Sequence, residues 1–297
     1  MKKTVVLLMI FSIMSLVWAN GPDEDLFTAA MDSNYSLLQE SIKNGANPNY
    51  ADGNFNDRTA LMVACSQDWY EGVKYLVEKG RANASYKNSN GQTALMFAAR
   101  YCQSEDIINY LVKRCAANIN AKDNNGRTPL MYAAENKSDR VFSLLLQLGA
   151  NYNSDDIYGE DALMYSIRND YIYGVTSILK APGVVNLEKQ NSEGQNAFML
   201  ACEKGNLKIA AALIDNTYFN LGMKCNGEPV LIWLIKNRKS RKFIELVINA
   251  PDVTASDILS YTDRNGHDAR WWAEEKGDEI TLQELDEKQK KSKKNKN

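Results

Sequence analysis

The side chains that could carry out chemistry are few in this sequence, and their spacing is wide. The chain has one histidine, His267, and no Cys-x-x-Cys pair. Catalysis by histidine dyads and most zinc sites need imidazole at two or more positions, or closely paired thiolates. Glycine-rich phosphate loops are also absent from the sequence. We therefore expect no metal site, no cofactor and no enzymatic activity.

The cysteines offer the one alternative to this reading. They are spread over the chain without motif spacing: Cys65, Cys102, Cys115, Cys202 and Cys225. An odd number leaves at least one thiol unpaired, so we do not expect a disulfide framework. A thiol-dependent enzyme would need a cysteine whose pKa is lowered by a neighbouring cation. Cys115 follows Lys113 and Arg114 and is the one candidate for such a role.

The N-terminus has the pattern of a secretory signal peptide. Two lysines precede an apolar run of 13 residues, 5–17, and Val17 and Ala19 stand at the positions that a signal peptidase inspects. We predict cleavage between Ala19 and Asn20 and a periplasmic or secreted protein. The run is too short to cross a bilayer of about 30 Å as a helix, so we expect no stable membrane insertion after cleavage. An uncleaved N-terminal anchor is the alternative.

Charge is distributed unevenly along the chain. The last ten residues hold six lysines, whereas residues 20–287 carry 27 basic and 37 acidic side chains, a net charge of −10. An acidic body argues against nucleic acid as a partner, because phosphate binding depends on lysine and arginine. Residues 286–297 have no apolar side chain, and we expect them to form a disordered, solubilising tail. Contact with an anionic surface is the alternative for the lysines.

An internal repeat organises the 297 residues. The segment Gly91-Gln92-Thr93-Ala94-Leu95-Met96 returns as Gly126-Arg127-Thr128-Pro129-Leu130-Met131. The threonine column of this pattern contains Glu24, Thr59, Thr93, Thr128, Asp161, Asn196, Pro229 and Asp268. Successive members lie 33 to 35 residues apart, except for a last step of 39. A period of this length indicates stacked units of supersecondary structure.

The repeated pattern resembles the ankyrin repeat. Its best copy has an Asp-x-x-Gly turn at 123–126, Thr128-Pro129-Leu130, the pair Ala133-Ala134 and Gly149-Ala150-Asn151. The resemblance covers residues 23–285. It implies an all-α solenoid of about eight stacked helix-turn-helix repeats with hairpin-like turns between them. We assign the repeat domain to residues 20–285, with degenerate capping repeats at both ends.

The residues themselves favour two helices in each repeat. Thr128 can cap exposed N–H groups, and Pro129 suits the first position of a helix. Apolar side chains recur at helical spacing over residues 141–148 and form one stripe. Two short helices cannot bury such a stripe alone, so successive pairs must stack against each other.

One column departs from the family, which has histidine there. The column contains Phe27, Met62, Met96, Met131, Met164, Met199, Ile232 and Trp271. We interpret it as part of the hydrophobic core. The hydrogen bonds that the family histidine makes are then expected to be missing, with flexible thioether packing in their place.

The resemblance places a partner along the concave side, at the turn tips and the first helices. Offsets from the threonine column select twelve candidate contact residues: Phe55, Arg58, Gln67, Asn90, Gln92, Arg100, Tyr101, Asn125, Arg127, Glu135, Tyr158 and Arg168. Arginine and aromatic side chains are frequent in binding hot spots. We predict a monomeric scaffold that binds a protein or peptide with acidic or aromatic features. Simple solvation of these side chains, or a secreted effector that engages host proteins, are the alternatives.

Overall fold

Paired helices account for most of the structure. The computed structural model describes residues 21–216, 219–250 and 253–294, so the predicted signal peptide and its cleavage site lie outside the described residues. Within them, strands occur only as two short antiparallel hairpins, β1 (Ala51–Asp52) with β2 (Arg58–Thr59), and β3 (Lys224–Cys225) with β4 (Glu228–Pro229). The predicted all-α class is confirmed.

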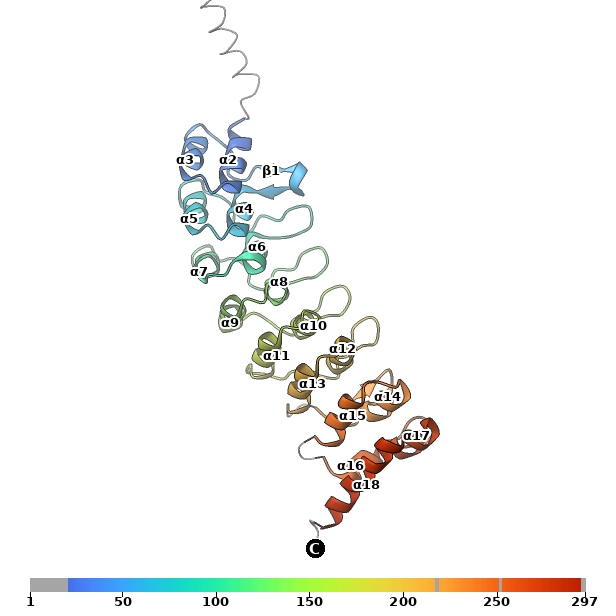
Figure 1. Cartoon of the computed structure of the whole chain (residues 1–297). Helices are drawn as coiled ribbons and strands as arrows, with labels where there is room; N and C mark the ends of the chain where they lie inside the picture. The colour runs from blue at the N-terminus through green and yellow to red at the C-terminus, as the bar shows by residue number, and fades with distance from the viewer. Residues whose placement is uncertain (1–20, 217–218, 251–252, 295–297) are drawn as a thin grey trace, which may run out of the picture. The chain divides into compact units, whose positions relative to one another are not determined.

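The chain divides between Asn124 and Asn125 into two compact units, which we call unit 1 and unit 2. Unit 1 contains three helix pairs, in which the second helix of each pair packs beside the second helix of the next (Figure 1). The pairs are α2 (Pro22–Met31) with α3 (Tyr35–Lys43), α4 (Ala60–Ser66) with α5 (Tyr70–Glu78), and α6 (Ala94–Tyr101) with α7 (Asp106–Lys113). A 3-10 turn, η1 (Gly53–Phe55), lies between β1 and β2.

Unit 2 contains five helix pairs and one additional short helix, α16 (Ala255–Ser260). The pairs are α8 (Pro129–Asn136) with α9 (Asp139–Gln147), α10 (Ala162–Arg168) with α11 (Ile172–Leu179), α12 (Ala197–Lys204) with α13 (Leu207–Ile214), α14 (Val230–Lys236) with α15 (Arg241–Ile248), and α17 (Ala269–Lys276) with α18 (Glu279–Lys294). The additional helix lies within the 39-residue step of the repeat. The described residues therefore hold eight pairs, as the repeat spacing predicts.

The first helices begin where the threonine column predicts. The side chains of Asp161, Asn196 and Asp268 each cap a helix by accepting the N–H of the residue three positions later, over 2.8 to 3.0 Å. The first repeat differs, because α2 begins directly after Gly21 with proline at its first position. Glu24 therefore lies inside the first turn of α2 and not at its start.

The methionine column lies in the core. All five methionines are at most 1% exposed. The expectation that their hydrogen bonds are missing is wrong in two repeats, since the N–H groups of Thr93 and Thr128 donate to the sulfur atoms of Met96 (3.5 Å) and Met131 (3.3 Å). The core assignment is also wrong for Trp271, which is 38% exposed and stacks on His267 with ring centroids 3.7 Å apart.

The C-terminal residues are more ordered than predicted. Residues 286–294, expected to be disordered, continue α18 as far as Lys294. Buried Thr281 and Leu285 anchor the first half of this helix, and the lysine, glutamine and glutamate residues that follow are good helix formers. Over the described residues, none of the helices combines the length and apolar character that crossing a bilayer requires.

Candidate functional site

The turns that carry several candidate residues are held by a recurring polar side chain. Oδ1 of Asp156 accepts the N–H groups of Tyr158 and Glu160, both at 2.8 Å, and the backbone N–H of Asp156 donates to the carbonyl of Glu160. Asn191 makes the equivalent bonds one repeat later. Each turn is thus a closed hairpin whose tip has a defined position, as the resemblance implies.

Backbone hydrogen bonds also join successive turn tips within unit 2. The N–H of Ile157 donates to the carbonyl of Asn125 (2.9 Å), and the N–H of Ser192 donates to the carbonyl of Tyr158 (2.8 Å). Gly126 permits this approach, because its φ is +79° and a Cβ atom there would lie 2.9 Å from the Cα of Asp156. The tips therefore form a ladder with a fixed register.

In unit 1 the structure brings three of the predicted residues together around Phe97. The guanidinium of Arg58 lies 4.9 Å from the centroid of the Phe97 ring, and this ring stacks on Tyr101. Arg100 lies over the other ring of the cluster, 5.6 Å from the centroid of Tyr101. Arg100 and Tyr101 are exposed, whereas Arg58 is half-buried.

The other candidates in unit 1 are more scattered. Phe55 is 43% exposed, and the centroid of its ring lies 5.3 Å from that of Phe27. Gln67 is exposed, and its Nε2 donates to the carbonyl of Met31 (3.0 Å). Asn90 is exposed at a turn tip, whereas Gln92 is half-buried behind it. The structure does not gather these four side chains into one cluster.

In unit 2, Arg127 is less exposed than its predicted role as a contact residue implies. Its side chain is 18% exposed and forms an ion pair with Glu135. The guanidinium also lies over two rings, 4.3 Å from the centroid of Tyr132 and 5.1 Å from that of Tyr165. Burial raises the pKa of Tyr165 against the opposing charge of Arg127, and the hydrogen bond that its hydroxyl donates to Asp156 (2.9 Å) raises it further.

Arg168 is likewise engaged within the protein. Its Nε lies 2.7 Å from Oε1 and 2.9 Å from Oε2 of Glu160, and its Nη2 donates to Gln195 (3.3 Å). The hydrogen bond to Glu160 raises the pKa of Arg168 above its ordinary value. Glu160 is only 7% exposed and also accepts a hydrogen bond from Asn191. Both oxygens of this carboxylate are therefore engaged by side chains of the protein itself.

A common geometry underlies these contacts in unit 2. In four successive repeats, the residue before the helix N-cap pairs with a residue eight positions later, at the end of the same first helix. The pairs are Arg127 with Glu135, Glu160 with Arg168, Gln195 with Glu203, and Glu228 with Lys236. We call them the turn–helix pairs. Sequence analysis missed them, although opposite charges eight residues apart in three repeats were visible.

Two large apolar side chains are exposed at one turn tip of unit 2. Tyr158 is 58% exposed, as predicted, and its neighbour Ile157 is 60% exposed. Ile157 was not predicted as a contact residue. An apolar residue directly before Tyr158 and Gly159, at a turn otherwise rich in polar residues, was the available signal. Asn125 is exposed on the preceding tip.

The surroundings of the cysteines disfavour a reactive thiolate. None of the five forms a disulfide bond, and four of them are buried. Burial, followed by the charge of Glu78, raises the pKa of Cys115, which is the opposite of what a thiolate nucleophile needs. Among residues 21–216, 219–250 and 253–294, no group of three or more histidine, cysteine or acidic side chains could hold a metal ion.

Comparison with protein families settles the class of fold. The model for ankyrin repeats, in three copies, matches residues 26–123, 105–187 and 173–257. The chain belongs to the ankyrin repeat family. Ankyrin repeats generally mediate protein–protein interactions, and the family typically serves as a non-enzymatic scaffold. No match to this ankyrin repeat chain is found among curated proteins.

Proposed function

We propose that the chain is a non-enzymatic scaffold that binds a protein or peptide through its turn tips and first helices. The observation that carries this proposal is the exposed pair Ile157 and Tyr158 at the tip of a hydrogen-bonded turn. Burying a large apolar side chain against a partner contributes about 1.5–3 kcal/mol. Because the turn is already ordered, little conformational entropy is lost when a partner binds.

The cluster around Phe97 supplies a second part of this surface in unit 1. Arg100 and Tyr101 present a cation and a ring to solvent, which favours partners with acidic or aromatic side chains. Arg127 and Arg168 contribute differently, because their turn–helix pairs hold the turns in place. We therefore assign direct contact to Arg100, Tyr101, Ile157 and Tyr158, and a positioning role to the paired arginines.

A matched pair of variants tests the proposal. Ile157→Ser with Tyr158→Ser removes the apolar tip, and Ile172→Ser with Tyr173→Ser removes the same residue types from α11, where they are 38% and 40% exposed. Partners would be crosslinked in the native cell, identified, and measured against each purified variant. We expect at least about a tenfold loss of affinity for the tip variant only. Equal affinities with unchanged circular dichroism spectra would refute the proposed surface.

We also propose that the chain is exported, with cleavage between Ala19 and Asn20. The lysine-led apolar segment of residues 1–19 supports this proposal. Mass spectrometry of the mature N-terminus tests it, and a first residue other than Asn20 would contradict the cleavage site. Recovery from an osmotic-shock fraction would indicate the periplasm, whereas recovery from the culture supernatant would favour a secreted protein that engages host proteins.

A further inference from the structure

The helix–helix turns of the last three helix pairs in unit 2 carry an excess of basic side chains. These turns join α12 to α13, α14 to α15, and α17 to α18. Because α13 packs beside α15 and α15 beside α18, the turns follow one another along one edge of unit 2. We call six residues of these turns and the adjoining helix ends the basic edge: Lys204, Lys208, Arg238, Lys239, Lys242 and Lys276. None of the six forms an ion pair with another described residue, and all but the half-buried Lys239 are exposed.

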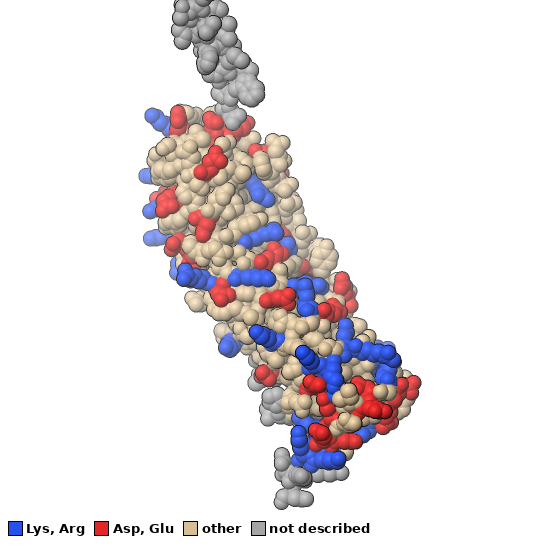
Figure 2. Space-filling view, viewed as in Figure 1, with Lys and Arg blue, Asp and Glu red and all other residues tan. Residues whose placement is uncertain are grey.

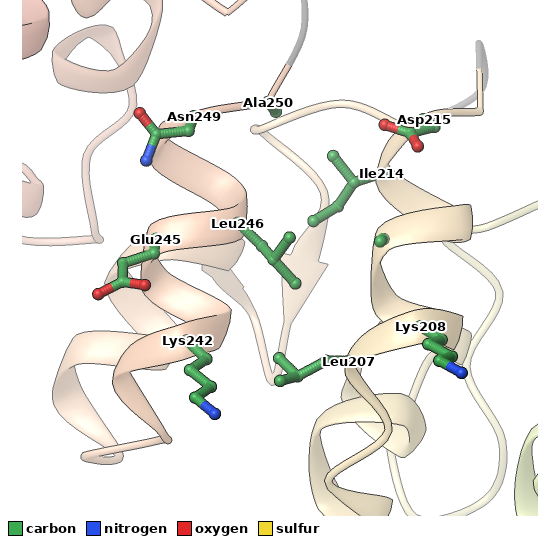
Figure 3. Close-up of a pocket in the computed structure, with 10 residues that line it drawn as sticks. Leu207, Lys208, Ile214, Asp215, Lys242, Glu245, Leu246, Asn249 and Ala250 are labelled. Carbon is green, nitrogen blue, oxygen red and sulfur yellow. The ribbon is translucent and has the colours of Figure 1, made fainter.

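Two observations connect the three turns. Lys208 and Lys242 lie at the same ends of α13 and α15, on either side of the groove between these helices (Figure 3). Arg238 and Lys276, from the next two turns, line one pocket together with Ile280, the second residue of α18. Ile280 is 55% exposed. The basic edge therefore runs past an apolar side chain that the fold leaves largely uncovered.

Acidic residues do not cancel this charge. Within two residues of the three turns, the acidic residues are Glu203, Glu275, Asp278 and Glu279. Glu203 accepts a hydrogen bond from Gln195, and Asp278 pairs with Arg241 (3.5 Å). In unit 1 the corresponding segments, 30–36, 65–71 and 100–107, hold five acidic residues and one arginine. The positive charge is therefore particular to this edge of unit 2, and it contrasts with the acidic body of the chain.

We propose that the basic edge docks on the surface of a bilayer that contains anionic phospholipids. Each lysine or arginine near such a surface raises the affinity about fivefold. Five of the six residues are lysines, which are depleted at protein–protein interfaces, and the three turn segments contain no aromatic residue. Ile280 adds to the affinity, because an exposed apolar side chain beside cations gains free energy when it enters the boundary between head groups and acyl chains.

Docking at this edge leaves the surface proposed for a protein partner free. Each first helix begins after a hairpin turn and ends at a helix–helix turn, so the two kinds of turn lie at opposite ends of the first helices. A helix of seven or eight residues separates them by about 10–12 Å. A docked chain therefore presents Ile157 and Tyr158 away from the bilayer.

Vesicle sedimentation tests the proposal, with the chain purified as its native cell produces it. Vesicles of pure phosphatidylcholine are compared with vesicles in which about a third of the lipid is phosphatidylglycerol. We expect at least about tenfold tighter binding to the anionic vesicles, decreasing as salt rises from about 0.05 M to about 0.5 M. Equal binding to both kinds of vesicle would overturn the proposal. Binding of a polyglutamate peptide without binding of anionic vesicles would assign the edge to an acidic protein and would overturn it too.

Charge variants locate the contact. Lys208→Glu with Lys242→Glu should weaken binding to anionic vesicles at least about tenfold. Lys74→Glu with Lys113→Glu makes the same change in net charge on exposed residues of unit 1 and should leave binding within about twofold. All four side chains are exposed, so we expect unchanged circular dichroism spectra. Equal binding by the two variants contradicts a contact through the basic edge.

A second pair of variants tests the apolar part of the contact. Ile280→Ser should weaken binding to anionic vesicles about threefold or more, whereas Val184→Ser, at a side chain that is 66% exposed elsewhere in unit 2, should not. Ile157→Ser with Tyr158→Ser should bind vesicles as the unchanged chain does, which keeps this test separate from that of the protein-binding surface. Equal binding by Ile280→Ser and Val184→Ser would contradict entry of Ile280 into the bilayer, and with it the choice of a bilayer as the occupant.

Discussion

The guanidinium of Arg168 lies against both carboxylate oxygens of Glu160, at 2.7 and 2.9 Å, across eight residues of sequence. Glu160 precedes the N-cap of α10, and Arg168 is its last residue. The contact therefore ties the inter-repeat turn to the far end of the helix that follows it. The same arrangement in the other turn–helix pairs of unit 2 indicates that these side chains stabilise the turns.

Arg168→Ala should destabilise the protein. The substitution leaves Glu160 buried with Asn191 as its remaining side-chain partner, and loss of one partner of a buried ion pair is strongly destabilising. Because the Arg168 side chain is 37% exposed, solvent screening reduces the loss to about 1–2 kcal/mol. Urea unfolding measures it, with Arg140→Ala, an exposed arginine of α9, as the control expected to change stability by less than about 0.5 kcal/mol. Equal midpoints for the two variants would contradict a stabilising role.

Met131→Leu should cost more stability than Met199→Leu, although both positions are at most 1% exposed in the same column. Leucine has nearly the volume of methionine, so the packing loss is less than about 1.5 kcal/mol in each case. Only Met131→Leu removes a sulfur that accepts a backbone N–H, that of buried Thr128, which adds about 1–2 kcal/mol. Thermal or urea unfolding of the two variants provides the comparison. Equal losses would mean that the thioether hydrogen bond contributes nothing measurable.

The buried thiols should make stability depend on alkaline pH. Burial raises the pKa of Cys65, Cys102, Cys202 and Cys225, the last to about 12. A thiol in the unfolded chain has a pKa of about 8.5, so pH above this value ionises the unfolded state alone and favours unfolding. Stability from these groups is fully present below about pH 8 and decreases above it. At pH 9.5 the loss is about 1.4 kcal/mol for each thiol.

Urea midpoints in reducing buffer at pH 7.5, 8.5 and 9.5 test this dependence. Cys202→Ala with Cys225→Ala should lower stability at every pH through lost packing, but should also reduce the decrease between pH 7.5 and 9.5 by about half. An unchanged pH dependence in this variant would show that other groups cause the decrease.

The repeat period predicts the helix starts because capping demands a particular residue type at one position. Asp161, Asn196 and Asp268 all have side-chain oxygens that can accept an N–H from the first turn, and all three are N-caps. The first repeat departs from the column because Pro22 starts α2 earlier than the aligned position. The continuation of α18 was missed because the prediction weighed apolar content and not the helix propensity of lysine and glutamine.

The surface was harder to predict than the helices. Arg58 and Arg127 occupy the same column, yet one lies over Phe97 and the other pairs with Glu135. Which partner an arginine finds depends on the residue eight positions later and on the ring in the neighbouring repeat. The residue type at one position of the repeat shows neither the residue eight positions later nor the ring in the neighbouring repeat. The exposure of Tyr158 follows from its position in the repeat, because a turn tip is exposed whatever its neighbours are.

Truncation should separate the anchored part of α18 from its exposed end. A chain that stops after Asp278 loses buried Thr281 and Leu285, and it also leaves Arg241 without its ion pair to Glu284. Figure 2 shows the basic and acidic side chains gathered over this region, where Arg270 also pairs with Asp286. We expect a loss of about 3 kcal/mol or more, since a buried leucine alone contributes about 2–3 kcal/mol.

A chain that stops after Lys290 should keep its stability within about 0.5 kcal/mol, because it retains every buried side chain of α18 named above. Circular dichroism during urea unfolding measures both truncations. If stopping after Lys290 were as damaging as stopping after Asp278, the lysine-rich end would have to stabilise the last repeat directly. If neither mattered, α18 would not act as the second helix of its repeat, because a helix that buries Leu285 against its neighbours cannot be removed without exposing apolar surface on α17 and α15.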